Sequence, residues 1–227
     1  MIDSKAFRPM SYGVYIISAV DGDFRAGCVA NTLVQVASKP ARVSIALNKE
    51  NATTDVVLKS GKFEAAVLAE TATMELIGRF GFHTSTELDK FAETSFAVDG
   101  QGVPYVTDHA VAHVGATVVE SIDVGTHMLI VGEVYEAEVL AAADPMTYAY
   151  YHLVKGGKTP PKAATFEEAA PTEPVANGPA AEAAPGEKRY GWQCQICGHI
   201  IEVDELPDDF ECPICGMGKE MFERVEL

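Results

Sequence analysis

The sequence is poor in basic residues. Its 227 residues include 17 lysines and arginines against 33 aspartates and glutamates, which gives a formal net charge of -16 at pH 7. The imbalance is greatest in residues 163–227, which hold four basic and fourteen acidic residues. A surface of this sign repels phosphate backbones and anionic lipid headgroups. We therefore expect neither a nucleic acid nor a membrane as partner, and a protein with a basic docking patch fits better, although acidic residues also serve solubility alone.

Long apolar runs are missing as well. No stretch approaches the ~20 apolar residues that span a bilayer, and residues 1–10 contain no apolar segment flanked by positive charge. Cysteine is scarce: of five in the chain, only Cys28 lies outside the last forty residues. Cysteines without disulfide partners are typical of a reducing compartment. These absences predict a cytoplasmic protein.

Neither of two glycine-rich nucleotide motifs, GxGxxG and the Walker loop, occurs, which argues against a Rossmann or P-loop site. The chain is 48% apolar, enough for one sizeable core and a small second module. Residues 167–187 consist mainly of alanine, proline and glutamate and show neither strand nor helix periodicity. The sequence thus predicts two domains, 1–166 and 188–227, joined by a linker that could reach ~65 Å.

Four cysteines near the C-terminus repeat one phrase. The two copies read Trp192-x-Cys194-x-x-Cys197-Gly198 and Phe210-x-Cys212-x-x-Cys215-Gly216. Each Cys-x-x-Cys turn lets two sulfurs face one ion, and the glycine permits left-handed backbone from which amide N–H groups point at the sulfurs. Four thiolates suit either zinc or iron. About forty residues cannot bury a sufficient core, so metal binding must supply much of the folding free energy.

The residues around these cysteines resemble rubredoxin. The resemblance rests on segments 189–198 (RYGWQCQICG), 206–219 (LPDDFECPICGMGK) and 222–226 (FERVE). The stretch between the two knuckles is shortened, as in the rubredoxin-like tails of rubrerythrins. The resemblance implies one iron, held by Cys194, Cys197, Cys212 and Cys215, that carries single electrons. A zinc ribbon that only folds the tail is the alternative.

Residues 1–166 are rich in predicted strands. Alternating Val, Ile and Ala bounded by Gly or Asp predict strands over 13–20, 24–30, 42–47, 62–68, 112–122 and 127–140. Helices are predicted over 53–60, 71–79 and 86–91, with Thr71 and Thr86 as N-caps of the last two. The fold class is therefore mainly β with short helices, and several short strands favour a barrel.

The order of motifs in residues 5–165 resembles the flavin reductase-like, FMN-binding split-barrel family. The segments that carry the resemblance are 21–32 (DGDFRAGCVANT), 38–40 (SKP), 48–51 (NKEN), 80–82 (FGF), 89–91 (DKF), 125–134 (GTHMLIVGEV) and 146–151 (MTYAYY). The resemblance implies a split β-barrel that forms a homodimer, with FMN near the subunit interface.

The same resemblance assigns roles to individual residues. The residues implied to bind FMN are Asn31 and Thr32 along the ring, Asn48, Lys49, Asn51 and Thr53 along the ribityl chain and phosphate, and Phe82 and Lys90 near the flavin. Without the resemblance, segment 48–54 has the amides, hydroxyls and lysine of a phosphate site, but a plain capping turn explains it better. His127 matches a histidine near the pyridine nucleotide and is implied to position it; a backbone-bridging histidine is the alternative. Cys28 and the tyrosines at 148, 150 and 151 are expected to pack in the core; for the tyrosines, lining the flavin cleft is the alternative.

The two modules together are similar to the high-molecular-weight rubredoxins of anaerobes. This implies that NADH or NADPH, with NADH favoured, gives hydride to FMN, which passes single electrons to iron. The implied acceptor is a flavodiiron protein that reduces dioxygen or nitric oxide. Two alternatives remain open at this point: a flavin reductase that supplies a separate oxygenase and has a zinc-ribbon docking tail, and an electron carrier reduced by another protein.

Overall fold

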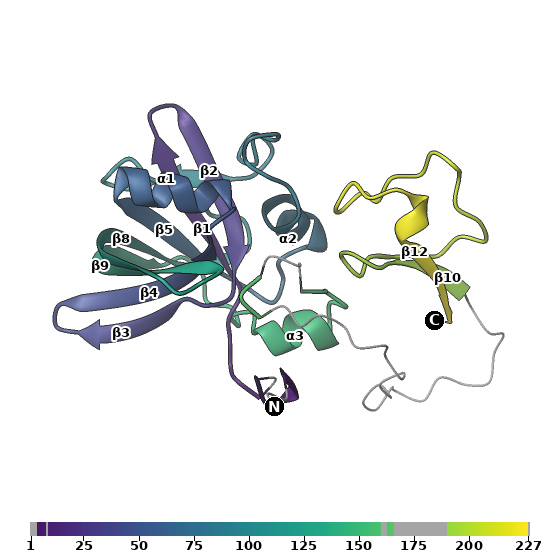
Figure 1. The fold of residues 1–227 in the computed structure, drawn as a ribbon, viewed down its shortest axis with the longest axis horizontal. Coiled ribbons are helices and arrows are strands. Elements are labelled where there is room, and N and C mark those ends of the chain that lie inside the picture. The colour runs from purple at the N-terminus through teal and green to yellow at the C-terminus, as the bar shows by residue number, and fades with distance from the viewer. Residues whose placement is uncertain (1–3, 8, 160–162, 166–189, 227) are drawn as a thin grey trace.

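A seven-stranded antiparallel sheet forms the body of the molecule (Figure 1). The computed structural model describes residues 4–7, 9–159, 163–165 and 190–226. The strands of the large sheet, in spatial order, are β2 (Phe24–Ala30), β1 (Tyr15–Asp21), β5 (Lys62–Leu68), β8 (Ala110–Asp123), β9 (His127–Val139), β4 (Ala41–Asn48) and β3 (Val34–Ser38). The predicted fold class, mainly β with short helices, is confirmed.

The long strands β8 and β9 give this sheet its curvature. Their pairing shifts register after Gly115 and again after Val118, and such bulges bend and twist a strand. A Cβ on Gly132 of β9 would lie 2.7 Å from the ring of Phe63, a fully buried side chain. Glycine at this position therefore lets the sheet fold closely over its largest core residue.

Three short helices accompany the sheet. Helix α1 (Ala52–Ser60) begins after Asn51, whose side chain accepts a hydrogen bond from the Thr53 amide, and it lies against β1 and β2. Helix α2 (Met74–Gly81) begins after Thr73, two residues later than Thr71, the predicted cap. Helix α3 (Tyr148–Leu153) was not predicted. Among the residues that the structure describes, no helix is long and apolar enough to cross a membrane.

The helix predicted over 86–91 is wrong, because residues 84–94 form a series of turns. Asp89 accepts a hydrogen bond from the Phe91 amide, so its side chain competes with helical bonding. Lys90 is buried, and its ammonium donates to the carbonyls of Gly27 and Phe80. These tertiary bonds stabilise the loop. A small hairpin of β6 (Phe96–Val98) and β7 (Pro104–Val106) follows it.

Residues 190–226 form a second, three-stranded sheet, drawn in yellow and green in Figure 1. Strand β10 (Tyr190–Cys194) lies between β11 (Ile200–Ile201) and β12 (Phe222–Glu226). Its small core consists of the four cysteines with Leu206, Ile214 and Phe222. We call this unit the four-cysteine module. The predicted linker, 167–187, lies outside the described residues.

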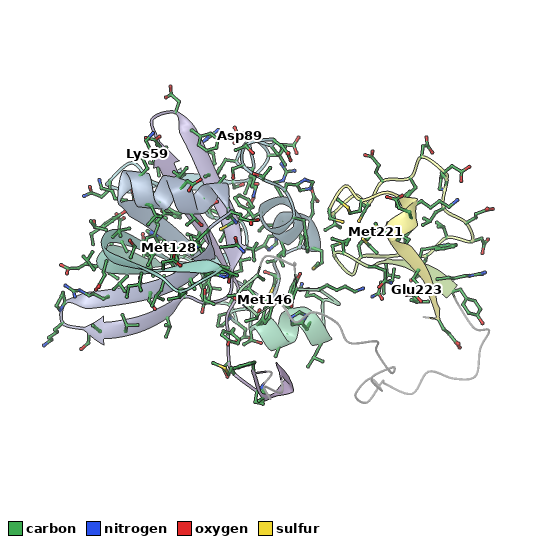
Figure 2. The ribbon with its side chains drawn as sticks, viewed as in Figure 1. Lys59, Asp89, Met128, Met146, Met221 and Glu223 are labelled. Atoms are coloured by element: carbon green, nitrogen blue, oxygen red, sulfur yellow. The ribbon has the colours of Figure 1, made fainter. Side chains whose placement is uncertain are left out.

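The described residues also include two 3-10 helices, η1 (Ser4–Phe7) near the N-terminus and η2 (Lys219–Met221) in the four-cysteine module. Figure 2 labels Met221 in that module and Met146 beside α3. The backbone of Met146 pairs with Val14 and Leu68. These bonds attach the segment before α3 to the end of β5 and to the residue that precedes β1.

Candidate flavin pocket and metal centre

The four cysteine sulfurs of the module converge on one point. All four lie within 4.8 Å of one another, and Cys194–Cys215 and Cys197–Cys212 are each 3.6 Å apart. Sulfurs placed 2.3 Å from one ion in a tetrahedron are about 3.8 Å apart. The geometry therefore fits a single tetrahedral ion.

Backbone amides surround the sulfurs, as expected from the glycines that follow each knuckle. Gly198 and Gly216 have φ of 81° and 71°, the left-handed region. Burial alone would raise the pKa of Cys194, but hydrogen bonds from the backbone amides of Cys197 and Ile196 lower it below its usual value. Such donors spread thiolate charge over the backbone. Burial raises the pKa of Cys197 and Cys215 above its usual value, so a bound metal ion is what would keep all four sulfurs as thiolates.

A pocket in the large domain collects residues from distant parts of the sequence. Four predicted site residues line it: Asn31 at the end of β2, Asn48 at the end of β4, Asn51 before α1, and His127 at the start of β9. Asn48 and His127 are paired directly across β4 and β9. The sheet register therefore brings together two residues that lie 79 positions apart in the sequence.

The remaining predicted cofactor residues lie outside the pocket lining: Thr32, Lys49, Thr53, Phe82 and Lys90. The Thr32 hydroxyl bonds to both the carbonyl and the amide of Ala46, which ties the end of β2 to β4. The Lys49 ammonium lies 2.8 Å from the Asp123 carboxylate. Their roles toward a flavin stay predictions.

Two of these residues have other partners in the structure. Lys90 donates to the Gly27 and Phe80 carbonyls at 2.8 and 3.1 Å, and burial lowers its pKa to about 8. Phe82 packs against the core of the four-cysteine module. The structure thus gives Lys90 a loop-fixing contact and Phe82 an interdomain one.

His127 is nearly buried, and its Nδ1 lies 2.8 Å from the Thr126 hydroxyl. This contact orients the imidazole at the pocket wall. The ring is therefore held in one position where a second ligand could meet it. Its role toward a pyridine nucleotide stays a prediction.

Two tyrosines for which the sequence favours a core role also form part of the pocket wall. Tyr148 and Tyr151 of α3 line it, as do Ala163 and Ala164. The next residue, Thr165, accepts a hydrogen bond of 2.8 Å from the Asn31 side chain. The tyrosines also belong to the core, as expected, so they serve both roles. Their spacing of three on one helix face was the available signal.

The lining of the pocket fits a flavin. Apolar side chains such as Val29 and Leu47 offer flat contact area, and the amides of Asn31, Asn48 and Asn51 offer hydrogen bonds. A few convergent polar groups on an apolar wall are typical of cofactor sites. An aromatic ring system with one polar edge and a polar chain matches this donor set.

Comparison with known protein families agrees with both sites. A flavin reductase like domain matches residues 7–157, and a rubrerythrin, rubredoxin-like domain matches residues 192–223. A high molecular weight rubredoxin of Moorella thermoacetica is 37% identical, covering 99% of this chain and all of that protein. A ferric-chelate reductase (NAD(P)H) of Archaeoglobus fulgidus is 47% identical over 74% of this chain and 99% of that one.

Solved structures share the fold of the large domain. A homologue of nitrilotriacetate monooxygenase component B from Mycobacterium thermoresistibile is 25% identical, with a TM-score of 0.57 over 63% of this chain and 79% of that chain. An NADH:FAD oxidoreductase of Streptomyces globisporus is 22% identical, with a TM-score of 0.58 over 65% and 90%. The second likeness concerns the fold alone.

Proposed function

We propose that this chain transfers electrons from a nicotinamide nucleotide to iron within one molecule. The chain belongs to the flavin reductase-like domain family and carries a rubredoxin-like domain. The chain is a flavin reductase-like oxidoreductase with an iron-type four-cysteine site. The route within the chain, FMN as the flavin and NADH as the favoured donor are our proposals.

One structural observation supports this route. Tyr151 lines the pocket, and its carbonyl accepts a hydrogen bond of 3.0 Å from the Gly157 amide. The preceding residue, Gly156, lies so close to the four-cysteine module that a Cβ on Gly198, directly after the ligand Cys197, would lie 2.1 Å from its carbonyl oxygen. One short segment thus connects the pocket wall to the metal-binding module. This proximity favours electron transfer between the pocket and the metal centre over two sites that act independently.

When bound, a flavin accepts a hydride and a proton and gives up the two electrons singly, each reducing one ferric ion to ferrous, with release of two protons. The chain's own residues supply position. Asn31, Asn48 and Asn51 orient the bound cofactor through their amides, and His127 holds the nucleotide over it. Cys194, Cys197, Cys212 and Cys215 hold the ion.

Other features of the proposal follow from the resemblance to high-molecular-weight rubredoxins. We propose a cytoplasmic homodimer and, as acceptor, a flavodiiron protein that reduces dioxygen or nitric oxide. The domain limits 1–166 and 188–227 with a linker over 167–187 belong to the same proposal. The acidic surface of residues 188–227, with nine acidic and four basic residues, suits a basic patch on such a partner.

An anaerobic titration with NADH tests the proposal. The iron-loaded chain should lose both its flavin absorbance and its ferric-thiolate absorbance. Complete bleaching should consume three NADH for every two chains, because each chain takes two electrons on its flavin and one on its iron. Flavin bleaching with the ferric band unchanged would contradict the internal route. Failure of both NADH and NADPH to bleach the flavin would leave a carrier that another protein reduces.

The similarity to a ferric-chelate reductase supports a second candidate function. That relative matches this chain over 74% of its length, and its name describes NAD(P)H-dependent reduction of a ferric chelate. In this case the large domain would reduce an external acceptor, or release reduced flavin to an oxygenase, without the four-cysteine module. Full turnover of a ferric chelate by a Cys215→Ser variant would favour it.

A further inference from the structure

Two glycines of the large domain lie against the four-cysteine module. A Cβ on Gly78 of α2 would lie 2.5 Å from Cγ2 and 2.7 Å from the carbonyl oxygen of Ile214. A Cβ on Gly198 would lie 2.1 Å from the carbonyl oxygen of Gly156. We call these four residues the glycine seam. A Cβ atom cannot be accommodated at these distances, so any side chain at position 78 must displace the module from α2.

Side chains on both sides extend the glycine seam. Met74 and Phe82, at the two ends of α2, pack against the core of the module. Beyond Gly156, the Lys158 ammonium donates to the Gln195 side chain at 3.0 Å. The contact is therefore an apolar patch on α2 with a polar contact at one edge, the composition of a small protein interface.

The seam adjoins the flavin pocket. Gly81, three residues after Gly78, lines the pocket. Tyr151 also lines it, and a Cβ on Gly157 would lie 2.1 Å from the tyrosine ring. Each half of the seam thus lies within a few residues of the pocket wall. Docking here brings Gly198, the residue after Cys197, against Gly156, and the next residue, Gly157, packs on the same tyrosine.

We propose that the glycine seam is a docking surface for the chain's own four-cysteine module, and that the docked arrangement is the one in which electrons pass from the pocket to the metal site. This inference rests on the proposed function. It adds the docking surface and two residues that determine docking: Gly78 lets α2 approach the module closely, and Lys158 supplies a positive charge.

Lys158 gives docking an electrostatic component. Its ammonium donates to the side chain of Gln195, the residue directly after the ligand Cys194, and an iron ion held by four thiolates carries a net negative charge. The ammonium is therefore attracted to the metal centre's negative ligands. Raised ionic strength should weaken this attraction.

Gly78→Ala tests the seam through two properties that move in opposite directions. Alanine is the better helix former, so the large domain should keep or gain thermal stability. The added Cβ should separate α2 from Ile214 and slow iron reduction about tenfold, the change produced by a loss of about 1.4 kcal/mol in docking free energy. Flavin reduction by NADH should be unchanged. Gly100→Ala is the matched control, since a Cβ there meets nothing closer than 3.6 Å.

Lys158→Gln should also slow iron reduction and remove its salt dependence. Its matched control is Lys155→Gln, three residues away, whose ammonium lies over the Tyr150 ring. Equal rates of iron reduction and equal salt dependence in the Lys158 variant and wild type would show that the charge of Lys158 does not contribute to docking. These variants leave the sulfur ligands and the pocket wall intact.

A structural readout separates docking from electron flow. In the zinc-substituted full-length chain, nuclear Overhauser contacts between the Ile214 Cγ2 methyl and the α-protons of residue 78 should be present in wild type and lost in Gly78→Ala. Persistence of these contacts in the variant, or their absence in wild type, would overturn the docking surface. If wild type shows the contacts but NADH never reduces its iron, the proposed function fails and the docking surface stands.

Discussion

Oε2 of Glu64 lies 3.1 Å from Nδ1 of His113, and both side chains are completely buried between β5 and β8. The ring of Tyr105 stacks on the imidazole, with centroids 3.9 Å apart. Burial, followed by the nearby Asp99 carboxylate, raises the pKa of Glu64 to about 9. Glu64 therefore carries a proton at neutral pH and can donate it to the histidine ring.

This pair predicts a stability that falls as pH rises. The pKa of Glu64 is higher in the folded chain, about 9, than its ordinary value of 4.5. The folded state then binds more protons between these values, and the free energy of unfolding decreases with pH by at most ~1.4 kcal/mol per unit. Urea unfolding at pH 6, 7 and 8 should show this slope in wild type and a shallower one in Glu64→Gln. Parallel slopes would contradict the prediction.

Asn51 is predicted to serve both helix α1 and the pocket. Asn51→Ala removes the cap of α1 and should lower the free energy of unfolding by about 1 kcal/mol, and it should also weaken flavin binding. Asn51→Ser retains a capping oxygen but lacks the amide. This control should keep the stability of wild type and show the weakened flavin affinity, measured by fluorescence titration. Wild-type affinity in both variants would place Asn51 outside the cofactor contacts.

Lys90 is predicted to stabilise the loop over 84–94. Lys90→Met leaves the carbonyls of Gly27 and Phe80 without the ammonium and should cost ~1–3 kcal/mol. Lys59→Met is the control, because Lys59 is an exposed lysine paired with Asp21, a type of contact worth little. Thermal unfolding compares the two. A selective loss of FMN over riboflavin affinity in Lys90→Met, with stability unchanged, would instead support the phosphate role.

His127 is predicted to position the nicotinamide nucleotide. His127→Ala should slow flavin reduction by NADH up to ~100-fold, since small misplacements of a reacting group cost that much. The flavin content of the purified variant should match that of wild type. Stopped-flow reduction at several NADH concentrations separates binding from the transfer step. Unchanged turnover would leave His127 as a structural histidine beside Thr126.

The metal ion is predicted to stabilise the four-cysteine module and not the large sheet. Trp192, the chain's single tryptophan, lies in β10 of the module, so its fluorescence reports this module alone. Metal removal should shift Trp192 emission to the red, while the far-ultraviolet dichroism of the large sheet persists. Cys215→Ser should behave like the metal-free chain, and Cys28→Ser should not. Retention of native Trp192 emission without metal would show that the module folds unaided.

Local patterns predicted well the elements whose causes are local. The six strands expected from alternation appear with shifts of a few residues at their ends, and α1 begins beside the polar cluster that predicted it. The glycines after the two Cys-x-x-Cys turns have the expected left-handed backbone. These features depend on residues within a few positions of one another, which a sequence shows directly.

Features that depend on distant residues were harder to predict. The loop over 84–94 contains a capping pattern, but the bonds from Lys90 to Gly27 and Phe80 prevent a helix. Tyr151 was expected in the core, and its place in the pocket wall depends on residues of β2 and β4, which are distant in sequence. The buried pair of Glu64 and His113 is absent from the sequence reasoning, since the two residues meet only through strand pairing.

Four features of this protein could be read from its amino-acid sequence: two modules, a four-thiolate metal site, a mainly β large domain and an acidic surface. Each follows from local spacing or from composition. The tertiary structure decided which polar residues share the pocket, which lysine is buried, and where the four-cysteine module meets α2. Those outcomes depend on sheet register and on the close approach that glycine permits, and neither is encoded in any single stretch of the chain.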